Sequence, residues 1–223
     1  MNTLTLVIGN KNYSSWSLRP WLFMKHHGLA FEEILIPLYA EGSAAAMKKY
    51  SPSGLVPVLI DGDLKVWDTL AICEYVSEKY LDGKGWPEDR RARAVARSVS
   101  AEMHAGFQKL RTNLPMNLKG RFDWRSVGDD VEKDIARVVE IWERCRADHG
   151  ADGPWLFGGF SIADAMFAPV AWRFHSYGVA LGEVAARYAK ALLQLDEMQA
   201  WYAAAIEESE VLPQLEARAL WPV

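Results

Sequence analysis

The chain has 223 residues, of which 50% are hydrophobic and 24% charged, and it carries ten Trp and a net charge of −4. This length and composition indicate one large globular domain or two small ones with an aromatic-rich core. We exclude nucleic acid as the expected main partner, because the chain offers no basic stripe that could displace counterions from phosphates.

The N-terminal stretch MNTLTLVIGN is too short and too uncharged for a secretory signal, and no apolar run approaches ~18 residues. We therefore expect a cytoplasmic protein with no membrane anchor. Cys73 and Cys145 lie far apart within helical patterns and lack metal-ligand spacing, so we expect two reduced cysteines and no metal site.

The first eighty residues alternate between strand and helix patterns. Strands are expected at 3–8, 31–38, 58–60 and 64–67, and helices at 18–29, at 44–50 and from Asp68-Thr69 onward. Pro20 is compatible with the first turn of its helix, and Asp61-Gly62-Asp63 predicts a hairpin turn. The order βαβαββα, with a right-handed crossover between the first two strands, predicts a thioredoxin-like domain over residues 1–81.

Residues 82–89, DGKGWPED, interrupt this pattern and indicate a linker. Only helical periodicities follow, so residues 90–223 predict an all-helical domain, a C-terminal helical bundle. Its helices are expected from Pro87 to near Pro115, from 131 to 150, from 161 to 174, from 184 to 193 and from 198 to 205, with a tail over 212–223. Ser161 and Asp164 have the spacing of a capping box, which we interpret as structural.

Two features of the stretch 51–72 predict a surface for a small peptide-like ligand. Pro57 stands before an apolar run yet cannot donate to a sheet ladder, so we expect a cis bond at Val56-Pro57. Asp68-Thr69 marks a helix N-terminus, whose free N–H groups suit a carboxylate. Both features are also compatible with architecture alone, as a fold-determining proline and an ordinary helix cap.

With the polar loop that follows the first strand, the sequence resembles the glutathione transferase superfamily. Three motifs carry the resemblance: YSSWSLR at 13–19, Ser51-Pro52 through Val56-Pro57 with Asp68-Thr69 behind it, and FSIAD at 160–164. The serine run is most similar to the zeta class, which includes maleylacetoacetate isomerases. The resemblance implies glutathione as cosubstrate and a homodimer.

The resemblance also implies roles in holding glutathione. Ser14 is the first candidate to stabilise the thiolate through its hydroxyl, Ser15 the second and Tyr13 the third. The alternative, that these serines are only helix caps, stays open on spacing alone.

The tripeptide backbone and its charged end would be held by the stretch 51–72. Val56, beside a cis Pro57, would pair with the cysteinyl backbone of glutathione. Thr69 would take the γ-glutamyl carboxylate through its hydroxyl and N–H, and Asp68 would face the ammonium group.

A second substrate is expected against the helical half. His104, Phe107 and Arg111 have the spacing of one helix face, and Arg173 lies on the expected central helix. Arg111 or Arg173 could hold an acidic group of the substrate, although interdomain ion pairing or surface exposure explains either arginine as well. Trp16 stands where the zeta pattern has Cys, and it would crowd or redefine the cavity beside the thiol. Tyr13 is a further candidate for the second-substrate site.

The sequence therefore predicts a glutathione S-transferase that conjugates a small electrophile after a serine hydroxyl has activated the thiol. One alternative is a glutathione-dependent cis-trans isomerase of an unsaturated diketo acid. Another is a catalytically silent glutathione-binding interaction protein. Trp16 would favour it, and so would Asp68-Thr69, which stands where the family usually has Glu or Gln followed by Ser. A cysteine-type thiol transferase is not expected, since no Cys occurs before Cys73.

Overall fold

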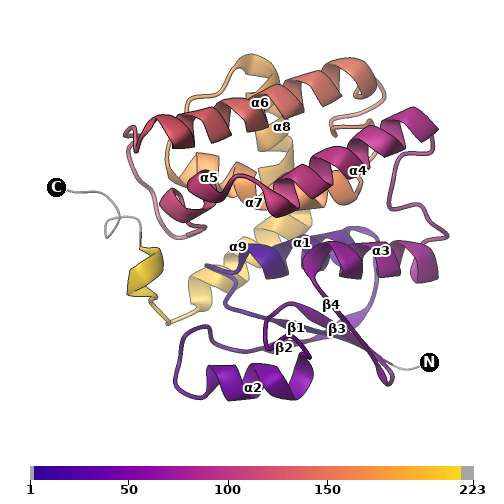
Figure 1. Ribbon diagram of the computed structural model, residues 1–223, viewed down its shortest axis with the longest axis vertical. Helices are drawn as coiled ribbons and strands as arrows, with labels where there is room; N and C mark the ends of the chain where they lie inside the picture. The colour runs from indigo at the N-terminus through magenta and orange to yellow at the C-terminus, as the bar shows by residue number, and fades with distance from the viewer. Residues whose placement is uncertain (1–2, 217–223) are drawn as a thin grey trace.

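The structure, a computed structural model, describes residues 3–216 and consists of a sheet-containing half followed by a helical half (Figure 1). The first half runs β1 (Leu4–Ile8), α1 (Ser15–His26), β2 (Phe31–Leu35), α2 (Ser43–Tyr50), β3 (Val58–Asp61), β4 (Leu64–Trp67) and α3 (Thr69–Tyr80). This is the predicted order, and it confirms the thioredoxin-like fold. The second strand is shorter than expected, because the Leu38 N–H turns to the side-chain oxygen of Asn10 at 2.7 Å.

The sheet has the strand order β2-β1-β3-β4, with β1 parallel to β2 and antiparallel to β3. Alternate residues of β1 are buried on opposite faces, since Leu6 joins the large core and Val7 packs with Val58 in a smaller one. Helix α2 covers the smaller core, while α1 and α3 lie on the other face, toward the helical half (Figure 1). The end of β1 therefore delivers the chain to the boundary between the two halves.

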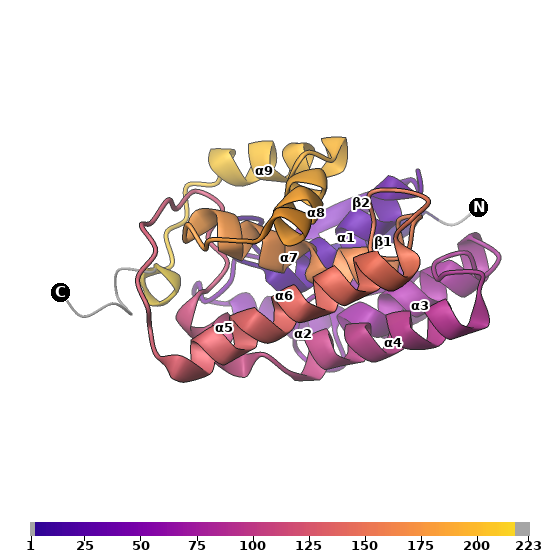
Figure 2. The ribbon, with the colours of Figure 1, turned by 90° about the horizontal axis from the view of Figure 1, so that it is seen from above.

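The helical half consists of α4 (Arg90–Ala105), α5 (Gln108–Asn113), α6 (Asp129–His149), α7 (Ile162–Ser176), α8 (Glu183–Leu193) and α9 (Asp196–Glu207). A short turn, Pro213–Leu215, follows. Within the helical half (Figure 2), α7 packs against α4 and α8 and also against α1 of the first half, while α6 packs against α5 and α8. Nearly every residue of α7 is buried, as its apolar sequence predicts. The predicted helical bundle is confirmed, whereas the domain limits stay a prediction and residues 217–223 of the expected tail lie outside the described residues.

The prediction of one long helix from Pro87 to near Pro115 is wrong, because the structure has two helices, α4 and α5, in this range. Asp89 caps α4 by accepting from the N–H groups of Arg91 and Ala92, so the helix begins after Pro87. It ends at Gly106, where an added Cβ would lie 2.7 Å from the Glu102 carbonyl oxygen, and Phe107 then adopts a left-handed φ of 55°. His104 and Arg111 therefore belong to two different helices.

No helix within residues 3–216 is both long enough and apolar enough to cross a bilayer. Cys73 and Cys145 are both free and buried, as expected.

Two adjacent histidines lie at the end of α1, where it meets the helical half. His26 packs on Phe160 with ring centroids 4.0 Å apart, and its Nδ1 lies 3.6 Å from Glu197 Oε1. His27 meets the edge of Phe23 at 4.7 Å. Burial lowers the pKa of both histidines, although Glu197 partly opposes the effect at His26.

We expect this histidine pair to destabilise the protein in mild acid. Because the folded state holds both pKa values below the ordinary 6.5, it binds fewer protons than the unfolded chain as the pH falls. Urea unfolding between about pH 7.5 and about pH 5.5 should show less loss of stability for a His26→Gln/His27→Gln variant than for the wild type. Identical slopes for the variant and the wild type would contradict the expectation.

Candidate active site

The serine loop lies between β1 and α1, at the boundary of the two halves. Ser14 caps α1, and its hydroxyl lies 2.7 Å from Ser17 Oγ, to which it donates. Ser17 Oγ also accepts from the Gly9 N–H at 3.1 Å. The two hydroxyls thus form a short chain anchored at the end of β1, on a helix N-terminus that favours negative charge.

Ser15 is held from the opposite half of the molecule. Its Oγ accepts from Nη2 of Arg173 at 3.2 Å, and Nε of Arg173 donates to the Leu114 carbonyl at 2.8 Å. Arg173 is buried, and its Nη1 has no hydrogen-bond partner among the described residues. Burial, with a further contribution from the charge of Arg111, lowers the pKa of Arg173 to about 10. A buried guanidinium with one unpaired nitrogen is a ready partner for an anion.

Trp16 lies between several cationic or ring groups. The guanidinium carbons of Arg19 and Arg111 lie 4.4 and 5.3 Å from its ring centroids, and His104 meets its edge at 5.3 Å. Arg19 is fully buried and donates to the Ser15 and Met166 carbonyls.

Arg19, Arg111 and Arg173 form no ion pair within residues 3–216. Burial, together with the charges of the other two arginines, lowers the pKa of Arg19. The serine loop therefore lies near three arginines that form no ion pair, and such positive charge favours an anion such as a thiolate.

The serine loop opens onto a cleft made of two adjoining cavities of about 640 and 270 Å³, which share Trp16, Leu55 and Val56. Among the predicted site residues, the larger cavity is lined by Tyr13, Ser14, Ser15, Trp16, Val56, Arg111 and Arg173. The smaller cavity is lined by Trp16, Val56, Pro57, Asp68, Thr69 and His104. The structure thus brings every predicted site residue to one cleft, and the lining of its larger cavity contains two arginines and no carboxylate.

Two features of the stretch 51–72 agree with expectation. The Val56-Pro57 bond is cis, and Asp68 caps α3 by accepting from the Leu70 N–H at 2.9 Å. Asp68 has φ 75° and ψ 136°, a strained conformation for a residue other than glycine, and such strain concentrates at ligand sites. Its other carboxylate oxygen lies 3.3 Å from Nε2 of His104.

The Thr69 hydroxyl has a partner that the sequence did not reveal. It donates to the Trp16 carbonyl at 2.9 Å. Pro20 lies in the second turn of α1 and not in the first as expected, and since it has no N–H, it leaves that carbonyl without its usual helical partner. The Thr69 hydroxyl therefore serves the fold, and its backbone N–H at the start of α3 is the group left for a carboxylate.

We expect Thr69→Val to cost about 1–2 kcal/mol of stability, because it leaves the partly buried Trp16 carbonyl unsatisfied. Thermal unfolding, compared with Thr112→Val at an exposed position of α5, measures the effect. Equal stability of the two variants would show that the hydroxyl is dispensable.

Tyr13 lines the cleft, but its hydroxyl is already committed. It donates to Glu216 Oε1 at 2.6 Å and accepts from the Leu212 N–H at 3.3 Å. Burial and the Glu216 contact raise the pKa of Tyr13. Both effects disfavour Tyr13 as the group that activates a thiol.

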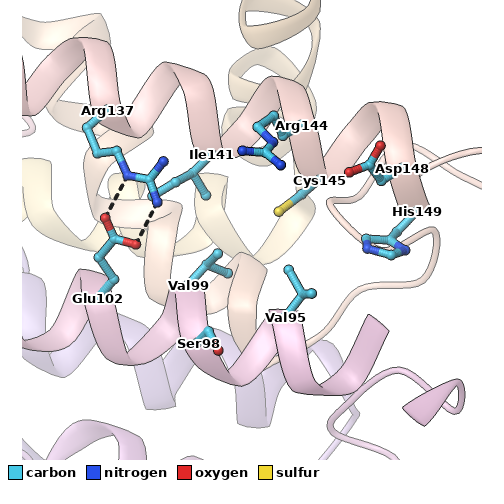
Figure 3. Close-up of a pocket in the computed structure, with 10 residues that line it drawn as sticks. All are labelled: Val95, Ser98, Val99, Glu102, Arg137, Ile141, Arg144, Cys145, Asp148 and His149. Carbon is cyan, nitrogen blue, oxygen red and sulfur yellow. Dashed lines mark hydrogen bonds and ion pairs between the residues drawn. The ribbon is translucent and has the colours of Figure 1, made fainter. Parts of the chain in front are cut away.

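A separate hollow of about 280 Å³ lies between α4 and α6 (Figure 3). Arg137 and Glu102 neutralise each other across it through paired hydrogen bonds of 2.8 and 3.0 Å. Its one thiol, Cys145, has its pKa raised to about 12, chiefly by burial, so it is unreactive. None of the predicted site residues lines this hollow, and we assign the candidate site to the serine cleft.

The fold and the cleft together define a two-domain protein of the glutathione-transferase class, in which a thioredoxin-like domain and a helical domain share one site. Residues 13–79 match the family model described as the N-terminal domain of glutathione S-transferase, and residues 91–204 match that of its C-terminal domain. The chain belongs to the glutathione S-transferase family.

Individual relatives agree with the resemblance to the zeta class. Glutathione S-transferase Z1 of Arabidopsis thaliana is 28% identical over 172 residues, which cover 71% of this chain and 74% of that protein. A probable maleylacetoacetate isomerase of Caenorhabditis elegans is 24% identical over 168 residues, covering 75% and 77%. A glutathione transferase homologue from Burkholderia, solved with bound glutathione, has the same fold, with a TM-score of 0.72, 21% identity and coverage of 93% of this chain and 100% of that one.

Proposed function

We propose that this protein binds glutathione in the serine cleft and conjugates its thiol to a small electrophile. One observation carries the proposal: Ser14 and Ser15, at the N-terminus of α1, line one of two adjoining cavities, and Val56, Asp68 and Thr69 line the other. This arrangement offers a hydroxyl to a thiol and backbone and charged groups to a peptide. Membership of the glutathione S-transferase family supports it.

In this proposal the tripeptide lies across both cavities. The γ-glutamyl end occupies the smaller cavity, with its ammonium group toward Asp68 and its carboxylate at the Thr69 N–H. The Val56 backbone pairs with the cysteinyl residue, as an added strand would. The thiol then points toward Ser14 in the larger cavity.

The serine loop would lower the pKa of the bound thiol by stabilising its anion. A hydroxyl proton rotates about its C–O bond, so Ser14 can turn its proton to the sulfur while Ser17 donates to Ser14 in turn. The helix N-terminus and the positive field of Arg19 and Arg173 act in the same direction. The thiolate attacks an electrophilic carbon and forms a C–S bond, and the leaving group departs with the electron pair of the bond that breaks.

A second candidate function is glutathione-dependent isomerisation of an unsaturated acid. The observation that favours it is the pair Arg111 and Arg173, which line the larger cavity with no carboxylate beside them. Reversible addition of the thiolate to a C=C bond would allow rotation about the resulting single bond, and elimination of the thiolate would restore the alkene. The similarity to a probable maleylacetoacetate isomerase supports this candidate.

The test is calorimetric titration with glutathione, followed by assays with a panel of neutral electrophiles and with an unsaturated diketo acid. We expect binding and turnover of at least one substrate. Binding without any turnover would favour an interaction protein, and absence of binding would overturn the proposal. Sedimentation of the same sample tests the homodimer, which we propose from the family alone.

Arg111→Gln separates the two candidate reactions. If Arg111 holds a carboxylate, the variant should raise KM for the unsaturated acid about tenfold, or ~1.4 kcal/mol, and leave KM for a neutral electrophile unchanged. Arg144→Gln, at an exposed position of α6 away from the serine cleft, is the matched control. Equal effects on both substrates would argue against a carboxylate contact at Arg111.

A further inference from the structure

The three residues directly before Ser14 are held by carboxylates from the C-terminal segment. Glu208, just after α9, accepts from the Lys11 N–H at 2.5 Å and from the Asn12 N–H at 3.0 Å. Glu216 accepts from the Tyr13 hydroxyl at 2.6 Å. Contacts between segments about 200 residues apart thus meet at three consecutive positions of one loop.

Further hydrogen bonds connect Glu216 and the loop at 11–13 to the helical half. The second carboxylate oxygen of Glu216 accepts from Nδ2 of Asn117 at 3.0 Å. Asn12 Oδ1 accepts from the N–H groups of Leu118 and Lys119 at 2.8 and 3.0 Å. The Lys11 carbonyl accepts from the indole N–H of Trp201 at 2.9 Å. The loop at 11–13 is therefore positioned by the helical half as well as by the sheet it leaves.

Displacement of this loop would move the serines. The Ser14 N–H donates to the Asn10 carbonyl at 2.8 Å, so residues 10–14 form one compact turn. A hydroxyl that stabilises a thiolate must be held to a fraction of an ångström, and misplacement by about 1 Å can cost about 100-fold in rate. The same segment also reaches the cleft directly, because Leu215 lines its larger cavity.

We propose that Glu208 and Glu216 are positioning residues, which set the place of the Ser14 hydroxyl through Lys11, Asn12 and Tyr13. The segment after α9 then contributes to the active site by positioning the serine loop. This inference rests on the proposed function, since it concerns the thiolate that the serine loop would bind. Neither glutamate need touch a substrate.

Glu208→Gln and Glu216→Gln test the proposal in the full chain. Glu208→Gln keeps the side-chain volume but turns an NH₂ group toward one of the two backbone donors. The readout is the pKa of the glutathione thiol when bound, from its thiolate absorbance over a pH series, together with kcat, KM and Tm. We expect each variant to raise that thiol pKa and to lower kcat about 10-fold or more, with KM for glutathione nearly unchanged. Glu210→Gln, exposed in the same segment, is the matched control and should behave as the wild type.

Tyr13→Phe provides a second route if a glutamate variant fails to fold. It removes the Glu216 contact from the other side. Because Tyr13 and Glu216 share that contact, Tyr13→Phe/Glu216→Gln should raise the thiol pKa by less than the sum of the two single changes. Variants that lower Tm but keep the wild-type thiol pKa and kcat would overturn the proposal and leave these glutamates a purely structural role. A wild-type protein that does not ionise bound glutathione would instead overturn the proposed function, and this inference with it.

Discussion

Ser14→Ala is expected to raise the pKa of the bound glutathione thiol toward the value of a free thiol, about 8.5. Removal of one donor from a developing or bound anion costs 10²–10³-fold in rate in comparable sites, so kcat/KM at neutral pH should fall about 100-fold. The deficit should shrink at alkaline pH, because the thiol then ionises without help. Thiolate absorbance and steady-state kinetics over the same pH series measure both effects.

Three further variants show which serine hydroxyl lowers the pKa of the bound thiol. Ser17→Ala should produce a smaller rise in the thiol pKa, since it removes only the hydroxyl that would donate to Ser14 once Ser14 has turned its proton to the sulfur. Ser98→Ala, at an exposed position of α4, controls for the loss of any serine. If Ser15→Ala has the larger effect and Ser14→Ala none, the activating group is Ser15, whose hydroxyl accepts from Arg173.

Asp164→Asn is expected to be the most destabilising of the substitutions considered, with a loss of about 3–5 kcal/mol. The Asp164 carboxylate is fully buried and accepts from the N–H groups of Leu156 and Ser161, from Ser161 Oγ and from the Tyr188 hydroxyl. An amide would place its NH₂ group against one or more of these donors. Urea unfolding measures the loss, with the exposed Asp123→Asn as control.

The pH dependence of this loss has a definite sign. Burial raises the pKa of Asp164 to about 6, above its ordinary value, so the folded state holds a proton that the unfolded chain has already lost. The contribution of that proton to stability is present below about pH 4 and is lost as the pH rises through about 6. The advantage of the wild type over Asp164→Asn should therefore be larger in acid than at neutral pH. An advantage that grows with pH would contradict this account.

Local patterns were sufficient for most of the fold. The alternation of apolar residues in β1 and the apolar stripe from Val131 to Cys145 each fixed an element within a few residues. The box formed by Ser161 and Asp164 gave the start of α7, because both of its hydrogen bonds lie within one turn. Such features depend on neighbours in sequence, which a single chain displays.

The break between α4 and α5 was missed because helical spacing alone does not reveal it. His104, Phe107 and Arg111 fit one helix by periodicity, yet Gly106 and the left-handed Phe107 end the first helix and redirect the second. Glycine within a helical pattern was the one local signal, and it is ambiguous. The side chains of His104 and Arg111 nevertheless both contact Trp16.

The contacts between the two halves could not be predicted from the sequence, because the residues involved lie far apart in the chain. Arg173 and Ser15 are separated by 158 residues, and Glu208 and Lys11 by 197. Nothing local distinguishes Glu208 from the neighbouring acids of its segment. Arg19 did carry a signal, since it is a charged residue within the otherwise apolar run 18–24 and has no acid at helical spacing.

The most direct test of the central claim is the pH titration of glutathione bound to the wild-type protein, followed by thiolate absorbance. We predict saturable binding and a thiol pKa lowered from about 8.5 toward neutrality, because a hydroxyl, a helix N-terminus and unpaired arginines all favour the anion. A bound thiol that titrates as it does in free glutathione, or absence of binding, would contradict the claim that the serine cleft activates glutathione.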